Sequence, residues 1–148
     1  MEDWKLGYLA GIVDGEGTIG IARYRADGTK RPQYRIHVVV TSGSISMLEF
    51  IQKDFGGKIS LIPERDINKK ACYRLTWVGH YAKELIPKII DKLQIKREHA
   101  EIIMSFPISR LAGGFTWFTE EENATRLSSY EKVKKLNERG NGVVFTVG

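Results

Sequence analysis

One short stretch decides the fold of this chain, and it reads Leu9-Ala10-Gly11-Ile12-Val13-Asp14-Gly15-Glu16-Gly17. It is apolar, contains small residues and ends in two acids separated by one residue. Gly7, Ala10 and Gly11 are spaced i, i+3 and i+4, so a helix would carry them as one stripe of small side chains. Such a stripe lets a second helix backbone come close. The pattern predicts a helix over about 4–14 with a close helix contact.

The two acids stand at the predicted C-terminal end of this helix. Gly15 and Gly17 stop the helix and leave Asp14 and Glu16 at its tip. A helix C-terminus already carries partial negative charge, so carboxylates held there need a cation, a buried hydrogen-bond network, or both. The alternative is an ordinary buried helix with a glycine cap. That alternative explains the apolar face but not the pair of acids.

Hydrophobic periodicity predicts the other elements. The alternation of Tyr34, Ile36, Val38 and Val40 with polar residues indicates a strand with one core face. Ser44 is placed to cap the helix that follows. Pro87 lies inside a helical pattern and favours a late start or a kink there. The predicted strands are 17–25, 33–41, 58–63 and 71–78, and the predicted helices after the first are 44–55, 81–92, 97–106 and, after a break, 128–138.

The stretch 9–17 resembles the LAGLIDADG homing endonuclease family, and Thr18-Ile19 continues it into a strand as that family does. The resemblance implies an α+β domain with the αββαββα order. In that fold an antiparallel, saddle-shaped β-sheet carries helices packed on one face. Leu111–Phe115 looks like a second copy but lacks the acids. One copy implies the single-motif, homodimeric type, with residues 1–148 as one domain and Gly7, Ala10 and Gly11 in the dimer interface.

Composition fits a DNA-binding protein without a membrane segment. The chain has 148 residues and a formal net charge of +5, which favours a polyanionic partner. Its single cysteine, Cys72, excludes an intramolecular disulfide and suits a reducing compartment. Glu2 and Asp3 are unlike a signal peptide. We therefore expect an intracellular protein, either in a prokaryotic cytoplasm or in an organelle.

The resemblance also implies the catalytic residues. Glu16 occupies the position of the family's metal-binding acid, and the carbonyl group of Gly15 is a further candidate ligand. Oxygen ligands favour Mg²⁺ or Mn²⁺. Asp14 is expected to support the helix end within the catalytic set. Lys96 lies where the family places a lysine near the phosphate, although an exposed lysine at a basic helix start is nearly as good an interpretation.

DNA recognition is expected on the strand face opposite the core. Strand ribbons enter the major groove, where arginine pairs with guanine and glutamine with adenine. The predicted strand residues are Tyr24, Gln33, Arg35, His37, Lys58, Ser60, Arg74 and Thr76. Residues near the hairpin tips are expected to contact phosphates instead. These are Arg25, Lys30, Arg31, Arg65, Lys69 and Lys70.

The leading hypothesis is a homodimeric, metal-dependent homing endonuclease. As the resemblance implies, it would hydrolyse DNA phosphodiesters at a long, near-palindromic site and leave a staggered double-strand break with 3′ overhangs. An intron-splicing maturase, or a DNA-binding protein without cleavage, on the same scaffold is the alternative. A purely structural domain would leave the acid pair and the basic strand face unexplained.

Overall fold

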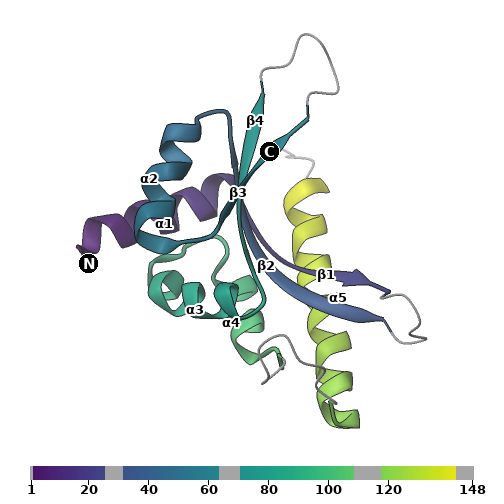
Figure 1. Ribbon diagram of the computed structural model, residues 1–148. Helices are drawn as coiled ribbons and strands as arrows, with labels where there is room; N and C mark the ends of the chain where they lie inside the picture. Colours follow the sequence, from purple (N-terminus) through teal and green to yellow (C-terminus); the bar gives the residue numbers. More distant parts are fainter. Residues whose placement is uncertain (1, 26–31, 64–70, 109–117, 143–148) are drawn as a thin grey trace, which may run out of the picture.

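The computed structural model describes residues 2–25, 32–63, 71–108 and 118–142, the last four of these by backbone alone. The elements confirm the predicted αββαββα order (Figure 1). They are α1 (Asp3–Glu16), β1 (Gly17–Tyr24), β2 (Gln33–Ser42), α2 (Ile45–Phe55), β3 (Lys58–Ile62), β4 (Cys72–Val78), α3 (His80–Ile89), the 3₁₀ helix η1 (Ile90–Lys92), α4 (Arg97–Ser105) and α5 (Glu120–Gly142).

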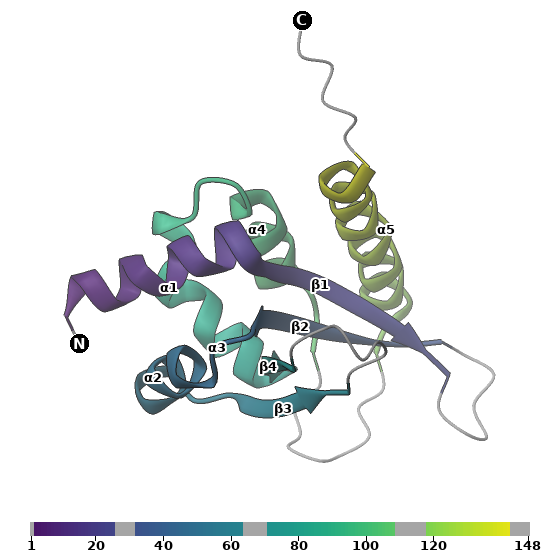
Figure 2. The ribbon, with the colours of Figure 1, turned by 90° about the horizontal axis from the view of Figure 1, so that it is seen from above.

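The four strands form one antiparallel sheet in the order β1-β2-β4-β3. The sheet is curved, and α1, α2, α3 and α4 lie on one side of it (Figures 1 and 2). Helix α5 runs along the β1 edge of the sheet. The predicted α+β class, with an antiparallel sheet covered by helices on one face, is confirmed. Among the described residues, no helix covers the opposite face of the sheet.

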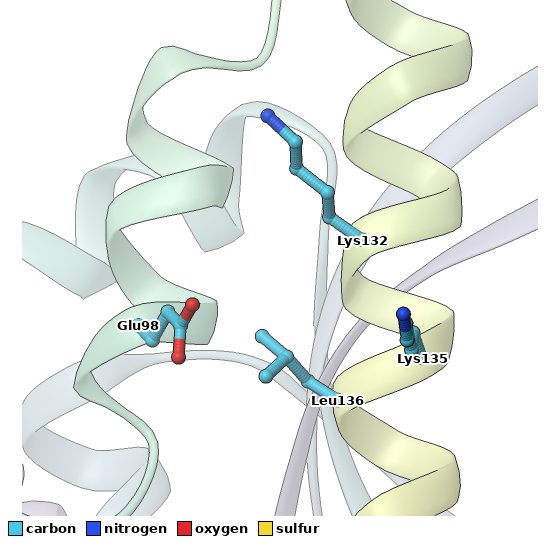
Figure 3. Close-up of a pocket in the computed structure, with 4 residues that line it drawn as sticks. All are labelled: Glu98, Lys132, Lys135 and Leu136. Carbon is cyan, nitrogen blue, oxygen red and sulfur yellow. The ribbon is translucent and has the colours of Figure 1, made fainter.

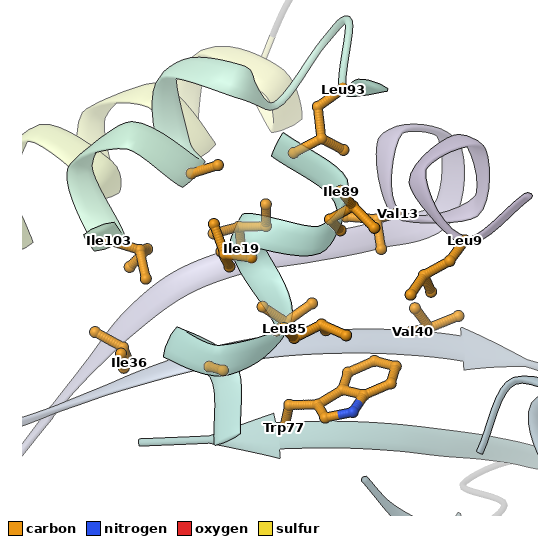
Figure 4. Packing of buried hydrophobic residues seen from close by; sticks show 14 of the residues in the cluster. Leu9, Val13, Ile19, Ile36, Val40, Trp77, Leu85, Ile89, Leu93 and Ile103 are labelled. Carbon is orange, nitrogen blue, oxygen red and sulfur yellow. The ribbon is translucent and has the colours of Figure 1, made fainter. Parts of the chain in front are cut away.

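Alternating residues of the strands build the core beneath the sheet. Ile36, Val38 and Val40 of β2 are buried, as the alternation predicts, and Leu75 and Trp77 of β4 join them. Helix α1 adds Leu9, Ala10 and Val13, and the helices α3 and α4 cover the other side of this layer (Figure 4). Burial of these apolar side chains is the main force that holds the helices on the sheet.

Helix α5 differs from the prediction because it has no break and begins at Glu120. Thr119 and Glu122 exchange hydrogen bonds between side chain and backbone N–H, both 3.0 Å long, and so form a capping box at the start of α5. Arg126 is buried, donates to the Tyr34 and Pro107 carbonyl oxygens, and lies 4.0 Å from the ring centre of Phe118. These tertiary contacts hold the helix together through the residues where a break was predicted.

The helix that contains Pro87 also differs from the predicted range 81–92. It ends at Ile89, and residues 90–92 continue as the 3₁₀ helix η1. The proline lies inside α3 rather than at its start. Because proline has no N–H to donate to the preceding turn, the helix is weakened just before the point where it tightens into η1.

Candidate active site and nucleic-acid interface

The junction between α1 and β1 is built around Gly17. Its N–H donates to the carbonyl oxygen of Val13 and closes the helix. A Cβ atom at this position would lie 2.8 Å from Val13 Cα and 3.2 Å from the carbonyl oxygen of Val39. Because both neighbours are backbone atoms, only glycine fits without a shift of the chain. The close turn fixes Glu16, which is exposed, at the point where the helix meets the sheet.

The carboxylate of Asp14 is held by a network of backbone donors. It accepts hydrogen bonds from the N–H groups of Gln94 at 2.7 Å, Ile95 at 3.1 Å and Lys96 at 2.9 Å. These groups immediately precede α4 and have no partner within that helix. The side chain of Asp14 therefore caps α4 from α1. This is the hydrogen-bond network that an acid at the end of α1 was expected to need.

Lys96 completes the junction in the opposite direction. Its Nζ donates to the carbonyl oxygen of Asp14 at 2.6 Å, so the cation lies at the negative end of α1. Burial lowers the pKa of the Lys96 ammonium, and the carboxylate of Asp14 partly offsets this effect. The two helix ends thus cap each other. Lys96 therefore lies at the end of α1 that carries Glu16.

Oxygen ligands for a divalent cation are few at this junction. Glu16 offers an exposed carboxylate, and Gly15 offers a carbonyl group in the last turn of α1. Among the described residues, no three His, Cys, Asp or Glu side chains come together in a way that could hold a metal ion. Mg²⁺ is commonly bound through one or two carboxylates, with waters and substrate phosphates as its other ligands. The donor set fits such a shared site and does not fit a closed protein cage.

The open face of the sheet gathers the predicted strand residues. Residue pairing places Tyr24 beside Gln33, Ser60 beside Arg74 and Lys58 beside Thr76, all on the face opposite the core. Arg35 lies on the same face, with its guanidinium carbon 5.3 Å from the ring centre of Tyr24. Arg25, at the end of β1, is exposed. The predicted hairpin residues Lys30, Arg31, Arg65, Lys69 and Lys70 lie outside the described residues.

His37 lies on this face but is turned down onto β1. Its Nε2 is 2.7 Å from the place that a Cβ atom on Gly20 would occupy. Burial lowers the pKa of the imidazole, and the charge of Arg74 lowers it further. His37 is therefore uncharged near neutral pH. It offers hydrogen bonds to a ligand but no positive charge.

Between the acids at its two ends, the solvent-exposed side of α1 carries glycines and aromatic residues. A Cβ atom at Gly7, Gly11 or Gly15 would meet nothing within 4 Å. Trp4 is 56% exposed and Tyr8 is 41% exposed on the same helix. Ala10, predicted in the interface stripe, is instead 1% exposed and packs in the core of its own chain. That prediction is wrong because Ala10 faces the core. The open stripe of α1 consists of Gly7, Gly11 and Gly15 at the spacing i, i+4, i+8.

Two residues of this region were not predicted from the sequence. Asn137 of α5 donates from Nδ2 to the carbonyl oxygen of Ile19 at 3.2 Å, and His99 of α4 is buried. A groove of about 230 Å³ lies between the same two helices, lined by Glu98, Lys132, Lys135 and Leu136 (Figure 3). No local pattern singles out Asn137 or His99, because each matters only through contacts between distant elements.

Comparison with solved structures finds the same fold in DNA-bound endonucleases. The homing endonuclease I-CvuI in complex with its target in the presence of Ca is 22% identical, with a TM-score of 0.67 over 90% of this chain and 82% of that chain. I-CvuI with the I-CreI target in the presence of Mg is 23% identical, with a TM-score of 0.63 over 97% and 87%. The archaeal intron-encoded homing endonuclease I-Vdi141I in complex with DNA is 16% identical, with a TM-score of 0.66 over 92% and 86%.

No curated protein matches the chain by sequence. No helix among the described residues is long and apolar enough to cross a membrane. The profile of the LAGLIDADG endonuclease family matches residues 9–105, from the core of α1 to the end of α4. This match spans more than half of the chain and confirms the predicted family and enzyme class. The chain belongs to the LAGLIDADG endonuclease family and is a DNA endonuclease.

Proposed function

We propose that this protein is a site-specific homing endonuclease that works as a homodimer with Mg²⁺ (or Mn²⁺). It hydrolyses DNA phosphodiesters at a long, near-palindromic site and leaves a staggered double-strand break with 3′ overhangs. One observation carries the proposal. Asp14 and Lys96 join the end of α1 to the start of α4, so that Lys96 is held at the end of α1 that carries Glu16, where β1 begins.

The homodimer is supported by the open side of α1. Gly7 and Gly11 leave room for a second helix backbone. The exposed apolar surface of Trp4 and Tyr8 would be removed from water in such a contact, which favours it. A two-fold contact uses the same surface on both subunits. Residues 1–148 then act as one protomer and one domain. Two α1 helices crossing here bring the two Glu16 carboxylates near each other.

The chemistry assigned to the junction uses few groups. Glu16 and the carbonyl group of Gly15 would hold the cation, which when bound supplies an activated water and stabilises charge on the phosphate. The I-CvuI complexes were obtained in the presence of Ca and of Mg, the latter with DNA that was not cleaved, and this supports the use of a divalent cation. The ammonium of Lys96 would supply positive charge near the scissile phosphate, and the carboxylate of Asp14 holds the backbone of Lys96 in place.

The open sheet face is the proposed DNA surface. Gln33, Arg35 and Arg74 have side chains that read base edges in the major groove. Arg25 and the predicted hairpin residues contribute phosphate contacts, which set register and affinity without reading sequence. The remaining strand residues, Tyr24, His37, Lys58, Ser60 and Thr76, share this face with them.

Selection from a plasmid library tests the proposal. The purified protein is incubated with randomised DNA sites and Mg²⁺, and the ends of the cleaved products are mapped. We expect cutting on both strands with 3′ overhangs, because two sites related by a two-fold axis reach opposite strands across the minor groove. Lys96→Met should slow this cleavage with little change in affinity. Specific binding without cutting would favour the non-cleaving alternative, and RNA-dependent splicing activity would favour a maturase.

A further inference from the structure

His99 is a buried histidine beside the proposed site. It lies in the first turn of α4, three residues after Lys96, and is 9% exposed. Lys96 is the N-cap residue of α4 and His99 is the third residue of the helix. The third residue of a helix is placed to reach back toward the N-cap, so His99 and Lys96 belong to the same helix start.

Asn137 holds the imidazole from another element. Its side-chain amide hydrogen-bonds His99 and also donates to the carbonyl oxygen of Ile19, three residues beyond Glu16. One amide thus connects α4, α5 and β1. Asn137 lies beyond the part of the chain that the family profile matches.

Packing does not account for a histidine at position 99. Its Nδ1 is buried and has no hydrogen-bond partner among the described residues. An unpaired buried nitrogen lowers stability, whereas a leucine fills a similar space without that cost. The property that distinguishes histidine here is its ability to gain a charge near neutral pH.

The charges around His99 keep it neutral. Burial lowers the pKa of the imidazole and the cation of Lys96 lowers it further, while Asn137 and Glu98 partly offset both effects. From α5, Lys132 and Lys135 line the groove beside Glu98 (Figure 3). From the sheet, His37 lies close to Asn137 at Gly20. Protonation of His99 would add a second cation next to Lys96, whose own pKa is already lowered by burial.

We propose that His99, held by Asn137, is a positioning residue for Lys96. The uncharged imidazole lets the Lys96 ammonium stay at the carbonyl oxygen of Asp14. Protonated His99 repels this ammonium, and cleavage then slows while DNA affinity does not fall. The part of the inference that concerns cleavage rests on the proposed function. The electrostatic coupling between the two side chains does not.

NMR titration of the DNA-free protein tests the coupling by itself. The histidine ring signals are followed against pH in the wild type, in Lys96→Met and in Asn137→Asp, with folding checked by circular dichroism. Removing the cation should move the titration midpoint of His99 upward. A carboxylate at position 137 should also move it upward, because it stabilises the imidazolium. Should Lys96→Met fold and leave the midpoint unchanged, the proposal is overturned, and Lys96→Gln repeats the test if the methionine variant does not fold.

Single-turnover cleavage against pH tests the consequence. The chain has three histidines, so His37→Gln, His80→Gln and His99→Gln cover every candidate. In the wild type the rate should fall as the pH drops below 6.5, the ordinary pKa of histidine, because the pKa of His99 is lowered. His99→Gln should keep its rate to lower pH, while His80→Gln, an exposed control, should follow the wild type. His37→Gln should change the affinity for DNA but not the fall of the cleavage rate at low pH.

Two results separate the possible failures. If the cleavage rate of His99→Gln falls over the same pH range as that of the wild type, the positioning role is overturned. A wild type that cuts no DNA would defeat the proposed function, and the NMR midpoints would still decide whether Lys96 and His99 are coupled. DNA affinity, measured without divalent cation, should not decrease as the pH falls through the cleavage limb.

Discussion

Glu16 is exposed at the end of α1, and its charge would hold the divalent cation in the proposed reaction. Glu16→Gln keeps the shape of the side chain but removes the charge that holds the cation. We expect cleavage to be lost while DNA binding persists or improves, because repulsion from phosphate decreases. Gel assays and fluorescence anisotropy measure the two properties separately. Glu49→Gln, an exposed substitution on α2, is the control, and normal cutting by Glu16→Gln would refute the assignment.

Asp14 is as important for stability as for the site. Its carboxylate accepts three backbone hydrogen bonds from residues 94–96. Asp14→Ala leaves these donors without their cap and should lower the free energy of unfolding by roughly 1.5–3 kcal/mol, the range for hydrogen bonds to a charged group. Urea unfolding provides the measurement.

A second aspartate supplies the control for Asp14. Asp54 forms a partly exposed ion pair with Lys5, 3.0 Å apart, and such pairs contribute less than about 1 kcal/mol. Asp54→Ala should therefore change stability much less than Asp14→Ala. Equal effects of the two substitutions would show that the cap on α4 contributes little.

At the scale of elements, α1 has one side in the core and one side open. Gly11→Leu places a large side chain where nothing lies within 4 Å, so the protomer itself should fold unchanged. The same side chain would hold two α1 helices apart. We expect monomers in sedimentation experiments and loss of specific DNA binding. Lys88→Leu, which adds a leucine to an exposed position of α3, should leave the assembly unchanged. A wild type that is monomeric at high concentration and on DNA would contradict this prediction.

At the scale of the whole molecule, the open sheet face and the net charge of +5 predict binding that weakens steeply with salt. Each neutralised phosphate contributes about −0.9 to the slope of log K against log salt. Arg25→Ala should lower affinity for all sequences alike and flatten this slope. Arg35→Ala should instead relax preference at particular base pairs, at a cost of roughly 1–3 kcal/mol if the contact is bidentate. Binding measurements over a salt series with matched and mismatched sites distinguish the two effects. A change of base preference in Arg25→Ala and a uniform loss of affinity in Arg35→Ala would contradict the roles assigned to these residues.

The sequence by itself determined the elements whose information is local. The periodicity of residues 9–17 predicts α1, and the alternation over residues 33–41 predicts β2 and its core face. The helix runs to Glu16 rather than to about residue 14, and Gly17 ends it while Gly15 does not. Alternation along β2 and β4 likewise placed Arg35 and Arg74 opposite the core residues of their own strands. These inferences hold because helix and strand repeats are properties of the chain and do not depend on what packs against it.

Only the tertiary structure decided which residues meet. Asp14 and Lys96 are far apart in the sequence, and their mutual capping arises because α4 packs against the end of α1. Ala10 faces the core rather than a partner because the neighbouring helices and the sheet select which side of α1 is covered. Asn137 joins α5 to Ile19 through a single amide. Such contacts carry no periodic signal, since their energy comes from groups that are brought together only when the whole chain has folded.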